Sequence, residues 1–335
     1  MGDSADLLHR AVQRLRDHSD LCVIAVSSQV ATPPIGGPPG QAAFLNAVVR
    51  LETSLSPFAL LAALQRIEQE LGRQRQSRWD ARTIDLDLLL YGDSVLDSPE
   101  LAIPHPRMAW RRFVLEPAAD VAGDMRHPVL GWTVQRMLEH LNAAPKYLAI
   151  TGAQPSNNRR LAVEVSSAMP GRLIADAGEC SMQVSIPSSG DEAYAREFQA
   201  FERRQQLLAR QSWIEDGRWA ISDFWLGESL AVAKAIFNAE QLGRFERAWR
   251  CVQGNVVEPK LIVLLDDTST TSFSSATSED AQDVGSTHRM QIAERIRELL
   301  LDQLSLPGQG PLLRVSNDDW AWVHEEVLAA LRGME

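Results

Sequence analysis

Residues 78–113 constrain this chain more than any other stretch, because acidic, basic and apolar residues follow one another there in a fixed order. Asp85 and Asp87 stand two apart in the run TIDLDLLL, residues 83–90, whose composition is typical of a β-strand. Residues i and i+2 of a strand point to the same face, so two carboxylates are expected side by side. Burying such a pair is costly unless a cation lies between them. The pattern therefore predicts a divalent ion such as Mg²⁺, bound through carboxylates and substrate phosphates.

Basic side chains surround this acidic pair in the sequence. They are Arg78, Arg82, His105, Arg107, Arg111 and Arg112. Guanidinium groups hold phosphates in a planar, two-point geometry, so carboxylates ringed by arginines indicate phosphoryl transfer from a nucleotide. The alternative is a solvated arginine-rich face beside an acidic pair that binds no metal, since two aspartates at this spacing are a weak signal by themselves.

Bulk composition bounds the class of protein. A chain of 335 residues suggests two domains, and 45% hydrophobic with 23% charged residues is typical of soluble globular proteins. The net charge of −11 argues against a nucleic-acid partner. Cys22, Cys180 and Cys251 form no metal-binding pattern and predict reduced, mostly buried thiols in the cytoplasm. No signal peptide is visible, and no apolar run approaches the ~20 residues of a membrane helix, so no membrane partner is expected.

Hydrophobic periodicity predicts the elements of the first part of the chain. Ser56 is the expected N-cap of the second helix, and Gly72 is expected to end it. The predicted order is a helix at 5–17, a strand at 21–27, a Pro/Gly-rich loop at 31–41, a strand at 44–52, a helix at 57–71 and a strand at 83–91. This helix–strand–strand–helix–strand order predicts an α+β ferredoxin-like domain over residues 1–142 that lacks its first strand.

The second part of the chain follows a linker at residues 142–145 and alternates between strands and helices. Residues 266–287 are dominated by Ser, Thr and Asp and predict a disordered loop. The expected strands are 147–151, 172–176, 219–222, 261–266 and 312–315. Alternation of this kind predicts a parallel α/β domain over residues 146–335.

Several motifs of the first part together resemble one enzyme family. They are Arg78-Trp79, Arg82-Thr83-Ile84-Asp85-Leu86-Asp87, Ile103-Pro104-His105-Pro106-Arg107, Phe113-Val114-Leu115, Thr32-Pro33-Pro34-Ile35-Gly36 and Phe44-Leu45-Asn46-Ala47-Val48-Val49. They resemble the signature of hydroxymethyldihydropterin pyrophosphokinases, and the resemblance covers about residues 2–142. It implies transfer of pyrophosphate from ATP to the hydroxymethyl group of a pterin, with AMP leaving, in folate biosynthesis.

The resemblance also implies a role for individual residues. Asp85 and Asp87 would bind two Mg²⁺ ions, and Arg73 and Arg82 would act on the phosphates. Expected ATP contacts are Glu68, Arg75, Arg78, Trp79, His105 and Arg111, and expected pterin contacts are Thr32, Pro34, Phe44, Asn46 and Phe113. Asp80-Ala81 stands where the family has Gly-Pro, which leaves the effect on activity open.

The family opens with a strand and a Gly-Ser-Asn-Leu-Gly-Asp turn, whereas this chain starts Met1-Gly2-Asp3, where that turn would finish. Either the true start lies upstream or this copy is damaged. The first explanation is favoured because residues 27–115 match the family so well. The second would make the chain a catalytically inactive interaction or regulatory protein.

Residues 146–335 resemble deoxynucleoside kinases, but the departures fall on the chemistry. A phosphate-binding loop reads G-x-x-x-x-G-K-[ST], whereas the run from Gly152 ends in Asn157, Asn158 and Arg159. The acid–arginine pair of the family appears as Asp223-Phe224, and the Ser/Thr/Asp loop replaces its arginine-rich lid. We expect an inactive P-loop-kinase-like domain that forms a homodimer or binds a regulator. A nucleoside kinase with unusual phosphate contacts is the remaining alternative.

Overall fold

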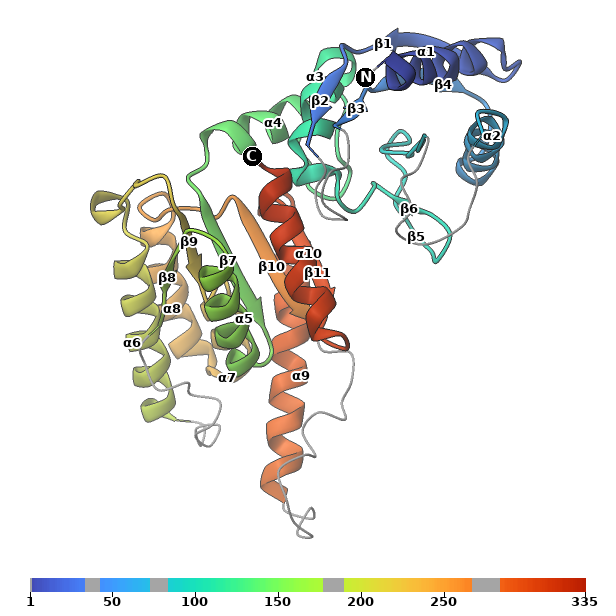
Figure 1. The fold of residues 1–335 in the computed structure, drawn as a ribbon. Coiled ribbons are helices and arrows are strands. Elements are labelled where there is room, and N and C mark those ends of the chain that lie inside the picture. The colour runs from blue at the N-terminus through green and yellow to red at the C-terminus, as the bar shows by residue number, and fades with distance from the viewer. Residues whose placement is uncertain (1, 34–42, 73–83, 177–189, 267–283) are drawn as a thin grey trace. The chain divides into compact units, whose positions relative to one another are not determined.

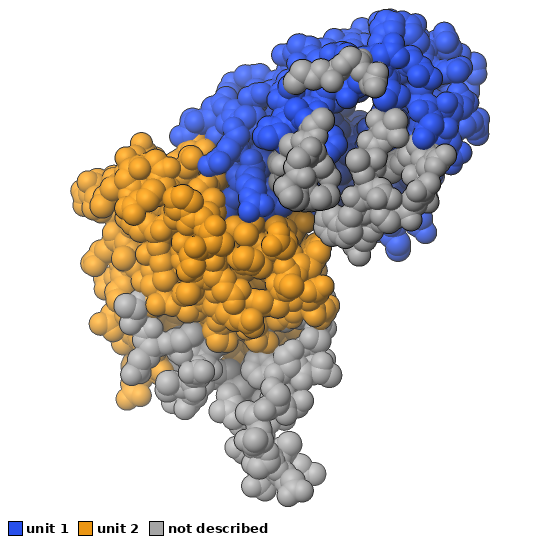
Figure 2. All heavy atoms as spheres, in the orientation of Figure 1, with its two compact units in different colours: residues 1–143, 329–335 blue, residues 144–328 orange. Residues whose placement is uncertain are grey.

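The computed structural model describes residues 2–33, 43–72, 84–176, 190–266 and 284–335 (Figure 1). The chain divides into two compact units (Figure 2), one of residues 1–143 with 329–335 and one of residues 144–328. Residues 329–335 are thus grouped with the first unit, although the sequence placed all of 146–335 in the second domain. Each unit is described by itself below.

The predicted helices at 5–17 and 57–71 and the predicted strand at 21–27 are present in the first unit, whereas residues 31 and 32 of the predicted loop belong to an additional strand. The elements are α1 (Gly2–Asp17), β1 (Leu21–Val26), β2 (Val30–Thr32), β3 (Phe44–Asn46), β4 (Val49–Thr53), α2 (Pro57–Glu70), β5 (Leu96–Asp97), β6 (Ala102–Ile103), η1 (Met108–Trp110), α3 (Arg112–Ala122) and α4 (Val134–Ala143). The predicted cap of α2 is confirmed, because the Ser56 side chain accepts a hydrogen bond from the amide of Ala59 at 3.3 Å. Gly72 follows the helix at φ +92°, a conformation that favours glycine.

The predicted strand over residues 44–52 is wrong as a single element. Residues 44–46 pair with β2, whereas residues 49–53 pair with β1 in a separate antiparallel ladder. The chain changes partner at Val48, whose amide donates to the Ser27 hydroxyl at 2.8 Å. Residues 47 and 48 belong to neither ladder, so the predicted run is divided into two strands.

The predicted strand over residues 83–91 is also wrong for the part that is described. Residues 84–91 pair with no strand among the described residues. Their burial still alternates, with Ile84 buried, Leu86 half-buried, and Asp85 and Asp87 exposed. Two backbone groups of this segment bond to a side chain and to a loop instead, since the Leu86 amide donates to Glu68 and the Leu89 carbonyl accepts from the amide of His105.

The core of the first unit lies between its helices and residues 84–91. Side chains of α1, β1, α2 and residue 84 form one buried cluster of Ala11, Leu15, Leu21, Leu60, Leu64, Ile67, Leu71 and Ile84. Val49 and Leu51 of β4 and Leu86 and Leu88 of the segment pack against it while only partly buried. The alternation in residues 84–87 therefore turns the aspartates away from the core.

The second unit is built on one parallel sheet flanked by helices (Figure 1). Its elements are β7 (Tyr147–Gly152), α5 (Pro155–Ala168), β8 (Gly171–Ile174), α6 (Asp191–Leu207), η2 (Arg210–Ser212), β9 (Trp219–Ser222), α7 (Glu228–Ile236), α8 (Ala239–Val252), β10 (Leu261–Asp266), α9 (Val284–Leu304), β11 (Leu312–Ser316) and the start of α10 (Trp320–Gly333). All five predicted strands are confirmed, in the spatial order β11-β10-β7-β9-β8. Every residue of β7 and β10 is buried, as expected for inner strands of a sheet covered by helices.

Two expectations from composition, one on the cysteines and one on membrane helices, can be compared with the structure. Cys22 and Cys251 are exposed, so the prediction of mostly buried thiols is wrong for these two, and Cys180 lies outside the described residues. Cys22 is turned outward because alternate residues of β1 face away from the core. Within the described ranges, the helices are all too short or too polar to cross a membrane.

Candidate functional site

The acidic pair of the first unit lies on the solvent side of residues 84–91. Asp85 and Asp87 are both exposed, and the Asp87 side chain is 50% exposed. Leu86, which lies between them, turns toward the core and packs against it. The structure therefore places the two predicted carboxylates on one side of an extended segment, as the sequence spacing required.

His105 faces this pair from the next loop. Its backbone amide donates to the carbonyl of Leu89 at 2.9 Å, which fixes the loop against the segment. The His105 Nδ1 accepts from the amide of Arg107 at 3.1 Å, and its Nε2 lies 3.9 Å from a carboxylate oxygen of Asp87. Burial lowers the pKa of His105, Asp87 opposes the shift, and Arg111 and Arg107 add to it. A neutral ring with Nδ1 accepting carries its proton on Nε2, the atom that faces Asp87.

A second group of predicted residues lies on the hairpin of β2 and β3. The Asn46 side-chain nitrogen donates to the carbonyl of Val30 at 3.2 Å and to the Thr32 hydroxyl at 2.9 Å. Phe44 pairs with Thr32 across the hairpin and is 42% exposed. Helix α3, which carries Phe113, packs against both strands. The elements that carry Thr32, Phe44, Asn46 and Phe113 thus meet in one place.

Arg111 precedes α3 and lies beside Phe113, with its guanidinium carbon 5.5 Å from the centre of the ring. This distance suits a cation–π contact and leaves the planar group at the start of a helix, near the aromatic residue predicted for the pterin. Glu68 differs from the other predicted residues because it is only 2% exposed, and its carboxylate accepts from the amide of Leu86 at 2.7 Å. The remaining predicted site residues, Pro34, Arg73, Arg75, Arg78, Trp79 and Arg82, lie outside the described residues.

The donor set of the acidic pair suits a metal that keeps substrate oxygens among its ligands. Among residues whose positions are described, His, Cys, Asp and Glu side chains form no cluster of three or more that could enclose an ion. Mg²⁺ is commonly bound by one or two carboxylates together with waters and phosphates, so Asp85 and Asp87 fit that ion without a third protein ligand.

The second unit carries a different acidic cluster where its parallel strands end. Asp176 follows β8, Asp223 follows β9 and Glu228 begins α7. Arg204 of α6 donates to Asp176 at 2.9 Å and lies 3.6 Å from Glu228. Burial alone would lower the pKa of Arg204, but Glu228 and Asp176 raise it, so the guanidinium stays charged.

Sequence reasoning did not find this cluster as a unit. The available signal was that Asp176 and Asp223 end neighbouring strands of a predicted parallel sheet, whose carboxyl ends lie at one edge. Arg204 gave no such signal, because it occupies an ordinary position within a long polar helix. Only the packing of α6 brings it to the strand ends.

The predicted phosphate-loop region of this unit is closed by its own contacts. The amides of Asn157 and Asn158 both donate to the carbonyl of Gln154, so α5 begins at Pro155, soon after β7 ends. A side chain at Gly152 would meet the carbonyl oxygen of Leu265 at 2.6 Å, which leaves room only for glycine. Arg159 donates to Asp223 at 2.8 Å. Two backbone donors of this region, the amides of Asn157 and Asn158, are therefore already used at the start of the helix.

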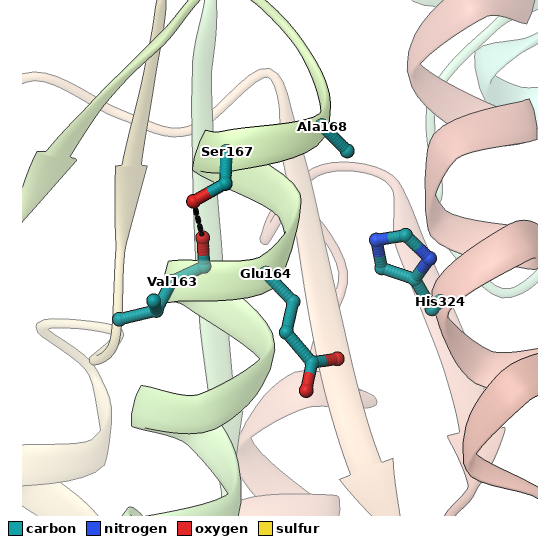
Figure 3. A pocket seen from close by; sticks show the side chains of 5 residues that line it. All are labelled: Val163, Glu164, Ser167, Ala168 and His324. Carbon is teal, nitrogen blue, oxygen red and sulfur yellow. Dashed lines mark hydrogen bonds between the residues drawn. The ribbon is translucent and has the colours of Figure 1, made fainter.

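A hollow on the second unit was not foreseen from the sequence (Figure 3). Val163, Glu164, Ser167 and Ala168 of α5 line it together with His324 of α10. The Glu164 carboxylate accepts from Arg160 at 2.9 Å and from the indole of Trp320 at 2.7 Å, and the Ser167 hydroxyl donates to the carbonyl of Val163. Most of its polar groups therefore already have partners within the fold.

Comparison with known proteins matches a family model to the first part of the chain. The family model described as 7,8-dihydro-6-hydroxymethylpterin-pyrophosphokinase matches residues 1–123. The 2-amino-4-hydroxy-6-hydroxymethyldihydropteridine pyrophosphokinase of Bacillus subtilis is 46% identical over 121 residues, which are 36% of this chain and 72% of that protein. The same enzyme from Pseudomonas aeruginosa is 50% identical over 106 residues, which are 32% of this chain and 65% of that protein. A solved structure of deoxyadenosine kinase from M. mycoides with dCMP and dCDP bound aligns with 54% of this chain and 96% of its own, at 12% identity and a TM-score of 0.42.

Proposed function

The chain belongs to the 7,8-dihydro-6-hydroxymethylpterin-pyrophosphokinase family, and on that premise we propose that it transfers pyrophosphate from ATP to 6-hydroxymethyl-7,8-dihydropterin, releasing AMP. The observation that carries the proposal is the pair of exposed carboxylates, Asp85 and Asp87, faced by the Nε2 atom of His105. The pterin hydroxyl attacks the β-phosphorus of ATP, the bond between the α- and β-phosphates breaks, and AMP leaves.

In this proposal Asp85 and Asp87 would together hold two Mg²⁺ ions. When bound, the metal neutralises charge that develops on the phosphate oxygens. The protein's own part is to keep two carboxylates exposed on one side of a segment whose other side is packed in the core. That arrangement leaves each aspartate able to meet ATP without a rearrangement of the core.

His105 supplies a neutral donor in this proposal. Because its pKa is lowered and its Nδ1 accepts from Arg107, the Nε2–H is available to a phosphate oxygen near neutral pH. Arg111 adds a fixed positive charge with a planar fork suited to phosphate. Arg73, Arg75, Arg78, Trp79 and Arg82 are proposed to complete the nucleotide side, as the family resemblance implies.

The pterin is proposed to bind at the β2–β3 hairpin. Asn46 offers its side-chain oxygen as an acceptor to the polar edge of the ring. Its side-chain nitrogen donates to Val30 and Thr32, and these bonds hold the amide in place. Phe44 and Phe113 are the proposed stacking partners on either side of the flat ring, with Thr32 and Pro34 at its edge. The exposure of Phe44 supports this, since 42% of an aromatic side chain is left open.

We further propose that the sheet of the first unit is completed in the ferredoxin-like manner, by a strand between β4 and residues 84–91. Partly buried Val49 and Leu51 on one side and Leu86 and Leu88 on the other support it. Alternate amides of β4 point away from β1, and the added strand would accept hydrogen bonds from them. We therefore expect slow hydrogen exchange at those amides. Fast exchange at all of them would count against the added strand.

For the second unit we propose a role without phosphoryl transfer, as a folded module that forms a homodimer or binds a regulator. The closed loop after β7 and the ion pair of Arg159 with Asp223 support this. A nucleoside kinase activity is less well supported, because Asn158 and Arg159 stand where the lysine and hydroxyl of such a loop would be.

The test is an assay of AMP release from ATP and Mg²⁺ with 6-hydroxymethyl-7,8-dihydropterin. AMP is expected only when both substrates are present, with the diphosphorylated pterin formed in equal amount. Release of ADP in place of AMP would contradict the reaction type. Absence of turnover, both in this chain and in a form extended at its N-terminus, would favour the inactive interaction protein.

A further inference from the structure

We infer that Glu68 is a positioning residue, which holds the backbone between Asp85 and Asp87 so that both carboxylates face away from the core; the inference rests on the proposed function. Glu68 lies near the end of α2 and is 2% exposed. Its carboxylate accepts a hydrogen bond from the amide of Leu86 at 2.7 Å. Leu86 lies between the two aspartates, so this bond fixes the backbone that joins them.

The place of Glu68 in α2 argues against a role in core packing alone. The helix positions that share its buried face carry apolar side chains, among them Leu60, Leu64 and Ile67. A carboxylate in such a row costs desolvation free energy that an apolar side chain of similar volume would not. We attribute its role to geometry, because its side-chain oxygen accepts a short, directional bond from a backbone donor.

The backbone of residues 84–91 is held at two described points. The Leu86 amide donates to Glu68, and the Leu89 carbonyl accepts from the amide of His105. Of these two bonds, the one to Glu68 lies directly between the aspartates. With Leu86 fixed toward the core, alternation turns Asp85 and Asp87 outward together.

This role differs from the direct ATP contact that the family resemblance implies for Glu68. A carboxylate that is 2% exposed and bound to a backbone amide acts on the nucleotide through the aspartates that it orients. The two roles make different demands on the side chain. Positioning requires an acceptor oxygen on a side chain as long as that of glutamate, and it depends less on the charge of that side chain.

Two variants of the full chain separate reach from charge. Glu68→Gln keeps the length and one acceptor oxygen but loses the charge, and Glu68→Asp keeps the charge but withdraws the oxygen by one methylene. Glu70→Gln is the matched control on the same helix turn, because Glu70 is exposed and faces Arg14 at 3.6 Å. Because both Glu68 variants keep a polar side chain of similar or smaller size, neither overpacks the core.

The first readout is hydrogen exchange at the Leu86 amide, which needs no substrate and no metal. We expect slow exchange in the parent chain, in Glu68→Gln and in Glu70→Gln, and exchange at least about tenfold faster in Glu68→Asp. Equal protection of Leu86 in all four proteins overturns the inference, whether or not the chain makes AMP. If the parent chain makes no AMP while Leu86 follows the expected order, the proposed function fails and the positioning stands.

The second readout is the Mg²⁺ concentration that gives half-maximal AMP release. Loss of a residue that orients metal ligands typically costs about 10- to 100-fold in metal affinity or activity, so Glu68→Asp should need correspondingly more Mg²⁺ with the KM for pterin unchanged. Glu68→Gln should lose less than about fivefold. A raised KM for ATP in Glu68→Gln with normal Mg²⁺ dependence would show a direct nucleotide contact, and lowered Tm with normal Mg²⁺ dependence would show a purely structural role; each overturns the inference.

Discussion

The two units use the same residue types at their candidate sites and arrange them in opposite ways. In the first unit the Asp87 side chain is 50% exposed, and Asp85 is exposed beside it. In the second unit the side chains of Asp176 and Asp223 are 13% and 9% exposed, and both are held by arginines. The first pair therefore lies at the surface of its unit, whereas the carboxylates of the second unit are bound by arginines and contribute to holding the fold together.

The arginines that bind Asp176 in the second unit come from one helix. In the second unit, α6 brings Arg203 and Arg204 to the end of β8, where both bind Asp176. In the first unit, most of the predicted phosphate-binding arginines belong to residues 73–82, which lie outside the described residues.

The largest effect is expected at the acidic pair. Asp85→Ala and Asp87→Ala should each lower AMP release by about 10³-fold or more, equivalent to about 4 kcal/mol of transition-state stabilisation. Stability should change little, because both side chains are exposed. Asp93→Ala is the control, since Asp93 is an exposed aspartate of the same region. Near-normal turnover in either variant would contradict the proposed catalytic role of the pair, and with it the functional difference between the acids of the two units.

The next effect is on the stability of the second unit. Arg204→Met should lower the free energy of unfolding by about 3–5 kcal/mol, because Asp176 and Glu228 would lose the cation that offsets their burial. Arg203→Met should cost less than about 1 kcal/mol, because this arginine is 38% exposed. Urea unfolding of both variants beside the parent chain measures the difference. Equal losses of unfolding free energy in the two variants would mean that the ion pairs of Arg204 contribute no more than surface ion pairs do.

Acid should weaken the first unit through a buried histidine outside its site. His127 is 8% exposed, its Nδ1 accepts from the amide of Leu130, and burial lowers its pKa to about 4. The unfolded chain, with a pKa near 6.5, binds the proton first as pH falls. Stability is therefore complete above about pH 6.5, is lost between that value and about pH 4, and falls by up to about 3 kcal/mol.

The measurement compares urea unfolding of the parent chain and His127→Asn at several pH values in that range. Asparagine can still accept from Leu130 but does not titrate, so the difference between the two proteins should shrink or reverse on acidification. His9→Asn, at an exposed position, should follow the parent chain. Parallel curves for all three proteins would show that His127 does not carry the acid sensitivity.

The smallest effect is expected at Asp223. Asp223→Asn removes the charge that pairs with Arg159, and it keeps an acceptor for the amide of Asp176. AMP release should not change, and neither protein should transfer phosphate from ATP to a deoxynucleoside. Measurable transfer by the parent chain that is lost in Asp223→Asn would show that the second unit is an active kinase.

The sequence by itself determined most of the elements and the identity of the acidic pair. Amphipathic spacing and the Ser56 cap were enough for α2, and apolar runs between polar helices were enough for the five strands of the second unit. These features are local, because a cap or a buried strand is specified by residues close to one another in the chain. The spacing of Asp85 and Asp87 is local too, so their common exposed side was predictable.

Tertiary structure alone decided how residues 84–91 are held and which partners Asp176 and Glu228 have. Strand composition over residues 83–91 predicted a ladder, yet a strand requires a neighbour, and the described backbone bonds to Glu68 and His105 instead. Arg204 reaches Asp176 and Glu228 only because α6 packs over the strand ends. Contacts between residues far apart in the chain depend on the packing of whole elements, and no local pattern in the sequence encodes that packing.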